Sequence, residues 1–243
     1  MYYSIKLYNN SCLDKEYKLN KSNHQSLRDF KFAQTRFNIL QTFLDLIIKK
    51  DYETVTVDEI CNLVRISRGT FFNYFPTKEH IYTFYGHCFC AKLLVALKTE
   101  DFEKSTCFDK IKYIFDFTVK EDQKYANQMP LYISHILRRD IYIIKEVEYT
   151  RADFIYQFPN RQDLFPDKAK IDLPTVGDLF IDLLKEGIET KEFKADIDIK
   201  KVVFNLLSLY FSPYIIYKFM RQECPLEEVY TSLLEEIIEP IRN

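Results

Sequence analysis

One short segment combines aromatic rings with small, polar and basic residues. Residues 66–80 read ISRGTFFNYFPTKEH. On a helix, which turns by about 100° per residue, Phe71 and Phe75 share one face, suited to burial against a neighbouring helix. The opposite face carries groups that pair with base edges or phosphates, and a glycine that permits close approach. These outward residues are Arg68, Gly69, Thr70 and Asn73. Their chemistry is that of a helix that enters a major groove of DNA.

Lys78 lies just beyond this helix, where a further helix is predicted to start at Pro76-Thr77. Its ammonium group, with the free N–H groups at that helix start, would hold a phosphate oxygen. Catalytic motifs such as a Gly-rich phosphate loop, HExxH and G-x-S-x-G are absent from the sequence, so an enzyme is not favoured. The segment HCFC at 87–90 lacks a second ligand pair, so neither a metal nor a cofactor is expected.

The elements that position these residues are short helices. In TVTVDEICNLVRIS, Thr56 and Glu59 have the spacing of a capping box and predict a helix over about 57–64. Ser67 can cap the next helix from Arg68, which leaves only RIS as the connection. Two helices this short need support from longer neighbours, such as the helix predicted from Gln34. The pattern predicts a helix-turn-helix within a three-helix bundle; an ordinary helical hairpin is the alternative.

The composition predicts an all-α protein of 243 residues with few glycines, 4 in all. Beyond the four N-terminal helices, periodic apolar spacing predicts five more, at 107–124, 130–158, 175–190, 198–221 and 226–239. This makes about nine helices. The expected divisions are a polar N-terminal extension (1–30), a helix-turn-helix DNA-binding domain (31–84), and a larger helical ligand-binding and dimerisation domain (85–243).

Charge and cysteine usage place few further limits. Residues 1–85 hold 12 Lys and Arg against 9 Asp and Glu, a net +3, and the remainder therefore carries 22 against 27, a net −5. This modest asymmetry fits a nucleic-acid-facing N-terminal unit. The N-terminus lacks a leader pattern and no membrane-spanning run is evident, so a cytoplasmic protein without membrane contact is expected. The six cysteines are expected to be reduced.

The capped helix TVDEIC followed by ISRGTFFNYFPTKEHIY resembles the N-terminal signature of the TetR family of bacterial transcriptional regulators. The resemblance extends over residues 34–82. It implies that the following residues meet DNA, with the last two on phosphates: Thr56, Val57, Asp58, Arg68, Gly69, Thr70, Asn73, Tyr74 and Lys78. Phe72 stands where a tyrosine that bonds phosphate is frequent; it lacks that hydroxyl, but its ring can pack on sugars and methyl groups.

The same resemblance implies a ligand cavity in the body. Aromatic residues with hydroxyl or imidazole groups would give it apolar walls with polar tips, suited to a small apolar or amphipathic effector. The residues assigned to it are Phe115, Tyr132, His135, Tyr142 and Phe180. The alternative is an ordinary helical core, which has the same composition.

The segment VVFNLLSLYFSPYIIYKFM is apolar around nearly its whole circumference. Such a helix must be buried on several sides. The resemblance implies a four-helix homodimer interface, here through residues 198–221 and 226–239. The alternative is a central helix of a monomer.

Together these observations predict a homodimeric regulator bound to a palindromic double-stranded DNA operator, and the resemblance implies that it is a repressor. Its two reading helices would enter major grooves about 34–36 Å apart. A small-molecule effector would release it. The competing interpretation is a co-activator or adaptor with the same fold, which binds a ligand or protein without reading DNA.

Overall fold

The computed structural model describes residues 26–99, 102, 104–124, 129–138, 147–165, 171–220 and 225–243. Its regular elements in these ranges are all helical, which confirms the predicted all-α class. The described ranges hold 10 α-helices, against about nine expected. They are α2 (Leu27–Lys49), α3 (Val57–Val64), α4 (Arg68–Tyr74), α5 (His80–Leu97), α7 (Cys107–Lys124), α8 (Met129–Arg138), α9 (Arg151–Gln157), α10 (Val176–Glu189), α11 (Ile199–Met220) and α12 (Leu226–Ile238).

The first described helix begins earlier than its hydrophobic spacing indicates. The apolar pattern predicts a start near Gln34, whereas α2 begins at Leu27. The Ser26 side chain is its N-cap and accepts the backbone N–H of Asp29 at 3.1 Å. The helix therefore enters the segment expected to be a polar extension, of which residues 1–25 lie outside the described part of the chain.

Helices α3 and α4 form the predicted helix-turn-helix, joined by residues 65–67. Arg65 ends α3 in the left-handed conformation, with φ 62°, and its N–H donates to the carbonyl of Cys61. With 8 and 7 residues, these helices are too short to be stable alone. Ile60 and Phe71, both 0% exposed, anchor them in the core that α2 lines. We call α2, α3 and α4 the N-terminal bundle.

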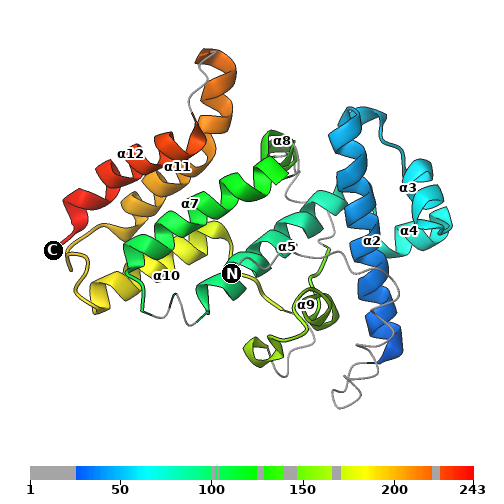
Figure 1. The fold of residues 1–243 in the computed structure, drawn as a ribbon, viewed down its shortest axis with the longest axis horizontal. Coiled ribbons are helices and arrows are strands. Elements are labelled where there is room, and N and C mark those ends of the chain that lie inside the picture. Colours follow the sequence, from blue (N-terminus) through cyan, green and yellow to red (C-terminus); the bar gives the residue numbers. More distant parts are fainter. Residues whose placement is uncertain are drawn as a thin grey trace.

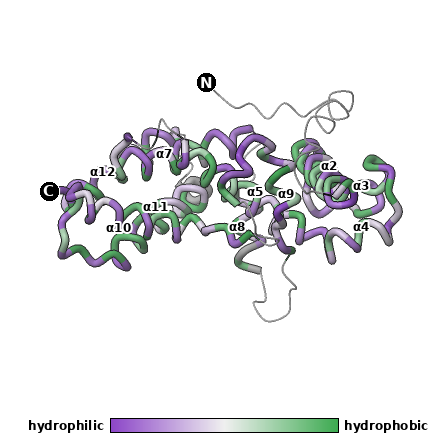
Figure 2. Tube along the Cα trace, turned by 90° about the horizontal axis from the view of Figure 1, so that it is seen from below, coloured by the Kyte–Doolittle hydropathy of each residue, from purple (hydrophilic) through white to green (hydrophobic). Residues whose placement is uncertain are grey.

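Two hydrophobic cores lie along the molecule, and α5 takes part in both (Figure 1). The first core joins the N-terminal bundle to α5 and α9, and Phe84 represents α5 there. The second joins α5 to α7, α10, α11 and α12, and Leu93 represents α5 there. Figure 2 shows the N-terminal bundle and α10–α12 at opposite ends of an elongated molecule. We call α5 and α7–α12 the body.

The prediction of a single helix over 130–158 is wrong. The structure has α8 and α9 there, and a new helix begins after Thr150. The Thr150 hydroxyl accepts the N–H of Asp153, and the Asp153 carboxylate accepts the N–H of Thr150 at 2.8 Å. This reciprocal capping box starts α9, which packs against α2. Part of the body thus completes the core of the N-terminal bundle, across the expected boundary at residues 84 and 85.

Helices α11 and α12 occupy nearly the predicted ranges and pack against each other (Figure 1). Pro213 lies within α11, as expected. The chain itself leaves apolar side chains of both helices uncovered: Phe204 (71% exposed), Ile215, Ile216 and Leu233. By length and composition alone, Ile199–Ile216 also passes for a membrane span, which is weak evidence because core helices of soluble proteins do the same.

Candidate nucleic-acid interface

The two faces of α4 separate as its sequence predicts. Phe71 and Phe75 are both 0% exposed, and the Phe75 ring lies 5.7 Å from that of Phe84 on α5. The Ser67 hydroxyl caps the helix by accepting the N–H of Thr70 at 3.1 Å. The side of α4 open to solvent carries Arg68, Gly69, Phe72 and Asn73. Burial of the aromatic side thus holds a polar, basic surface outward.

Gly69 is not required by the fold itself. Its φ is not positive, and a β-carbon built there meets only the Ser67 hydroxyl oxygen, at 3.8 Å. Glycine within a helix costs about 0.5–1 kcal/mol relative to alanine. A destabilising glycine on an open surface suits a place where another molecule approaches the backbone closely.

Arg68 is paired across the helix-turn-helix. Its Nη1 donates to both carboxylate oxygens of Asp58, each at 2.9 Å. The guanidinium carbon lies 6.0 Å from the centre of the Phe72 ring. Both charged side chains remain more than half exposed, at 62% for Arg68 and 58% for Asp58. Three residues assigned to the interface from sequence are therefore brought together on one surface.

At the start of α3 the predicted capping box forms only in part. The Thr56 hydroxyl accepts the N–H of Glu59 at 3.2 Å. The Glu59 carboxylate, expected to return to the N–H of Thr56, is paired instead with the ammonium of Lys50. Lys50 lies at the end of α2, and its positive charge attracts the Glu59 carboxylate more strongly than the N–H of Thr56 does. Val57, the next residue assigned to the interface, is half-buried.

Lys78 is held by the protein rather than extended freely. Its Nζ donates to the carbonyls of Tyr52 and Val55, both at 2.9 Å, and lies 4.0 Å from the centre of the Tyr52 ring. An ammonium has three donors, so one remains for a phosphate. Tyr74 is half-buried, with its ring 4.8 Å from that of Phe32 on α2.

The sequence interpretation missed residues at the start of α2. A groove separates this helix end from α4, and it is lined by Leu27, Arg28, Lys31, Phe32, Thr70, Asn73 and Tyr74. Arg28 and Lys31 are exposed and add two cations beside the outward surface of α4. The spacing of Ser26 and Asp29, a helix-start signal three residues apart, would have placed them on α2.

Of the residues assigned to an effector cavity, Phe115 and Phe180 belong to the second core, and Tyr132 and His135 are half-buried beside α5. Phe115 and Phe180 are both 0% exposed, with ring centroids 5.6 Å apart. Tyr132 packs so closely on α5 that a β-carbon at Gly86 would lie 2.5 Å from its hydroxyl oxygen. His135 Nε2 lies 3.2 Å from the Thr83 hydroxyl. Tyr142 lies outside the described residues. Entry of a ligand at this place would require these side chains to move.

A buried polar cluster between α7, α11 and α12 was not foreseen. The hydroxyls of Thr118 and Tyr210 are 2.9 Å apart, and the Tyr230 hydroxyl donates to the Tyr210 carbonyl at 2.8 Å. Nearby on α7, Asp122 is 4% exposed and accepts the N–H of Met129 at 2.6 Å. Burial raises the pKa of Asp122 to about 6. No sequence pattern signals this cluster, because its members come from separate helices.

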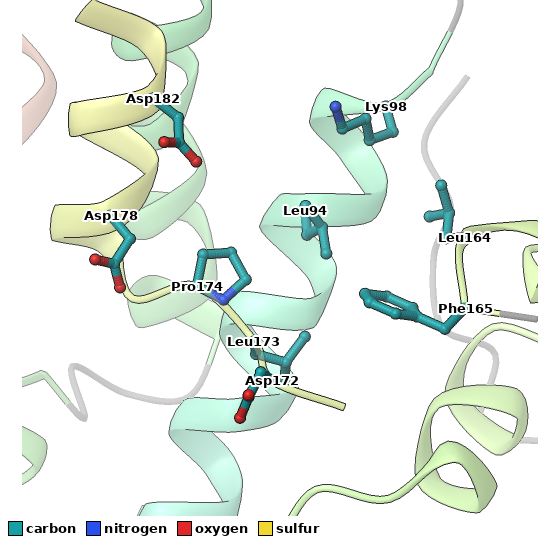
Figure 3. Close-up of a pocket in the computed structure, with 9 residues that line it drawn as sticks. All are labelled: Leu94, Lys98, Leu164, Phe165, Asp172, Leu173, Pro174, Asp178 and Asp182. Atoms are coloured by element: carbon teal, nitrogen blue, oxygen red, sulfur yellow. The ribbon is translucent and has the colours of Figure 1, made fainter. Parts of the chain in front are cut away.

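A second groove lies on the body between α5, α10 and residues 164–165 and 172–174 (Figure 3). Its volume is about 530 Å³. Its lining combines apolar side chains with four charged ones, Lys98, Asp172, Asp178 and Asp182. The Asp178 carboxylate is already engaged, since it caps α10 by accepting the N–H of Thr175 at 2.9 Å.

Metal-ligating side chains do not gather in the described ranges, where no group of three or more His, Cys, Asp or Glu residues is found. The four cysteines in these ranges are free thiols: Cys61, Cys88, Cys90 and Cys107. Burial raises the pKa of Cys90 and of Cys107 to about 12, which leaves these thiols protonated and unreactive.

Comparison with known proteins bears on the helix-turn-helix first. Residues 39–83 match the family model described as bacterial regulatory proteins, tetR family. A segment of 59 residues is 34% identical to the HTH-type transcriptional regulator TcmR of Streptomyces glaucescens. That match covers 24% of this chain and 26% of the regulator.

The whole fold resembles solved structures of the same kind. One is FadR of Thermus thermophilus, a TetR family transcriptional repressor in complex with lauroyl-CoA, with a TM-score of 0.58 and 19% identity over 84% of this chain and 93% of that one. Another is the regulator FadR of Bacillus subtilis in complex with stearoyl-CoA, with a TM-score of 0.56 and 17% identity over 85% and 99% of the two chains. At these identities the likeness concerns the fold.

Proposed function

We propose that this chain, which belongs to the tetR family of bacterial regulatory proteins, is a homodimeric transcriptional repressor that a small apolar or amphipathic effector releases from a palindromic operator. One observation carries the proposal. The exposed side of α4 presents Arg68, Gly69 and Asn73, while Phe71 and Phe75 are completely buried behind it. A helix held in this way can enter a major groove and form hydrogen bonds with base edges.

The dimer is supported by the uncovered apolar side chains of α11 and α12. Phe204, Ile215 and Ile216 lie exposed on α11 and Leu233 on α12, at the end of the molecule opposite the N-terminal bundle. A symmetric partner would cover them with the same two helices. Two recognition helices would then face one side of the DNA.

The effector is proposed to act through the body. The second core contains the buried polar cluster of Thr118, Tyr210 and Asp122, which could supply hydrogen bonds to a ligand that displaces neighbouring rings. Since α5 takes part in both cores, a ligand that favours a different packing of the body would move the N-terminal bundle. Its effect on DNA affinity equals its differential affinity for the two conformations.

The DNA-binding proposal is tested by selecting duplexes from a randomised library with the purified full-length chain. We expect enrichment of a two-fold symmetric site, bound with an affinity that falls steeply with salt. Asn73→Ala should weaken binding to that site, whereas Asn38→Ala, at an exposed asparagine in the middle of α2, should leave it unchanged. Failure to enrich any sequence would overturn the repressor and favour the adaptor.

The effector proposal has its own test. Long-chain acyl-CoA thioesters are the first ligands to try, because two structural neighbours hold lauroyl-CoA and stearoyl-CoA. An effector should lower affinity for the selected duplex, and the duplex should lower affinity for the effector by the same factor. A ligand that binds without changing DNA affinity would contradict the release mechanism.

A further inference from the structure

We infer that Arg68 reads a guanine in each half-site, and that Asp58 is the positioning residue that reserves Arg68 for a base edge instead of a phosphate. The inference rests on the proposed DNA-binding function and specifies which residue sets one base of the operator. It is carried by the contact between Arg68 Nη1 and both oxygens of Asp58, on the exposed surface of the helix-turn-helix.

The donors left on Arg68 match guanine. A guanidinium has five N–H donors in a rigid plane, and Asp58 engages those of Nη1. The remaining Nε and Nη2 donors lie along one edge and point in parallel. Guanine presents two acceptors, O6 and N7, on its major-groove edge, and a bidentate arginine fits this pair. Asp58 therefore leaves free the edge that guanine requires.

The charge of Asp58 affects the two possible ligands of Arg68, a phosphate and a guanine edge, differently. The Asp58 carboxylate, 2.9 Å from Nη1, offsets part of the charge that Arg68 would offer to a phosphate. It would also repel a phosphate that approached the same guanidinium. The guanine edge carries no net charge, so it keeps both hydrogen bonds without that repulsion. Asp58 thus lowers the affinity of Arg68 for the DNA backbone and raises its selectivity for a base edge.

Phe72 is the second side chain that lies close to the Arg68 guanidinium. Its ring is 43% exposed and lies T-shaped on the buried Phe71, with centroids 5.4 Å apart. The guanidinium carbon of Arg68 lies 6.0 Å from the Phe72 centroid, so the side chain has both a carboxylate and an aromatic ring as neighbours. Two neighbours limit its rotamers before DNA binds, which reduces the ordering required on binding.

The test compares duplex selections by the full-length wild type and by Arg68→Lys, Asp58→Asn and Asp163→Asn. Wild type should select guanine at one position of each half-site. Arg68→Lys keeps the charge but loses the two-donor edge, and should reduce the preference for guanine there by about 5- to 150-fold. Asp58→Asn should reduce the same preference and strengthen binding to unrelated duplexes. Asp163→Asn breaks a surface arginine–carboxylate pair of 3.4 Å, with Arg161 in the body, and should change neither.

The salt dependence of binding distinguishes a base contact from a phosphate contact. For Arg68→Gln we expect the slope of log affinity against log salt to stay at the wild-type value, since a base contact releases no phosphate counterion. A slope smaller by about 1, with affinity lost equally for all sequences, would overturn the inference while leaving the proposed repressor intact. If the wild type enriches no duplex at all, both the inference and the repressor fail.

Discussion

Arg36 of α2 and Asp153 of α9 form an ion pair inside the protein, with 2.6 Å between Nη1 and Oδ2 and exposed fractions of 2% and 0%. The same Nη1 donates to the carbonyl of Glu148 at 3.0 Å, and the guanidinium carbon lies 4.0 Å from the centre of the Phe84 ring. In the described part of the chain, Arg36 Nε and Nη2 and Asp153 Oδ1 have no hydrogen-bond partner. The pair is thus a directional and incompletely satisfied contact between the N-terminal bundle and the body.

Breaking this pair on one side should destabilise the fold strongly. Asp153→Asn leaves the buried guanidinium of Arg36 without a counter-charge, and we expect a loss of about 3–5 kcal/mol in the free energy of unfolding. Urea unfolding measures it. The double variant Arg36→Met with Asp153→Asn removes both charges and should recover part of this loss.

Glu239→Gln is the control for the buried pair, because it breaks the exposed pair with Arg242. An exposed pair contributes about 0–1 kcal/mol. If Asp153→Asn lowers the free energy of unfolding by no more than Glu239→Gln does, the buried pair does not hold the N-terminal bundle and the body together.

Gly69→Ala should raise stability and lower DNA affinity together. The added β-carbon meets only the Ser67 hydroxyl oxygen, at an ordinary contact distance of 3.8 Å, and removes the glycine penalty, so the free energy of unfolding should rise by about 0.5–1 kcal/mol. On DNA the same methyl group would hold the backbone of α4 away from the base edges. Thermal unfolding and duplex affinity measure the two effects, and unchanged affinity would show that no close approach occurs at Gly69.

Lys31→Ala tests the cations at the start of α2. If Lys31 contacts a phosphate, its removal should weaken binding to all duplexes and reduce the salt slope by about 0.9. Lys98→Ala, at an exposed lysine beyond the end of α5, is the matched control and should leave the slope unchanged. An equal change in both variants would point to general charge rather than to a contact.

Phe204→Glu tests the proposed dimer surface. The side chain is 71% exposed on α11 in the single chain, and a carboxylate there would be buried without a partner in a dimer. Sedimentation equilibrium should show a monomer, with duplex affinity lower by about 100-fold or more as the second half-site contact is lost. Leu137→Glu, at a leucine 77% exposed on α8, should remain dimeric. Dimerisation of both variants would exclude α11 as the interface.

Asp122→Asn should stabilise the protein near neutral pH. Burial raises the pKa of the folded-state carboxyl to about 6, above its ordinary value of 3.8. Ionisation is therefore easier in the unfolded chain, and wild-type stability falls as pH rises from about 4 to 6.

The asparagine can still accept the N–H of Met129 and carries no charge, so we expect a gain on the order of 2 kcal/mol at pH 7 that disappears below about pH 4. Asp182→Asn, at an exposed aspartate on α10, is the control for replacing one aspartate by asparagine. Urea unfolding at several pH values measures both variants. A gain for Asp122→Asn that does not vary with pH would contradict the raised pKa.

Much of the helical framework was predictable because its signals are local. The predicted ranges 57–64 and 107–124 are those of α3 and α7. The cap at Ser67 and the burial of Phe71 and Phe75 follow from residues at most a few positions apart. The start of α2 carried an equally local signal, Ser26 with Asp29, but lies where apolar spacing is weak.

The features that sequence patterns did not predict share a different cause. In each case, residues from another part of the chain contact the segment. Glu59 has the spacing of a capping box but pairs with Lys50, which the end of α2 brings close. The two carbonyls that accept from Lys78, more than twenty residues away, were likewise not foreseen, while its phosphate contact stays a prediction. The helix expected over 130–158 is divided because α9 packs on α2 and starts with its own cap at Thr150.

The class of fold, the helix-turn-helix and the two faces of α4 follow from the amino-acid sequence alone, because helix caps and the turn of about 100° per residue depend only on near neighbours. The contact of Asp58 with Arg68, and that of Arg36 with Asp153, 117 positions away, depend on the tertiary packing. Ion pairs form where the packing of whole helices brings opposite charges together, and no local pattern encodes that distance.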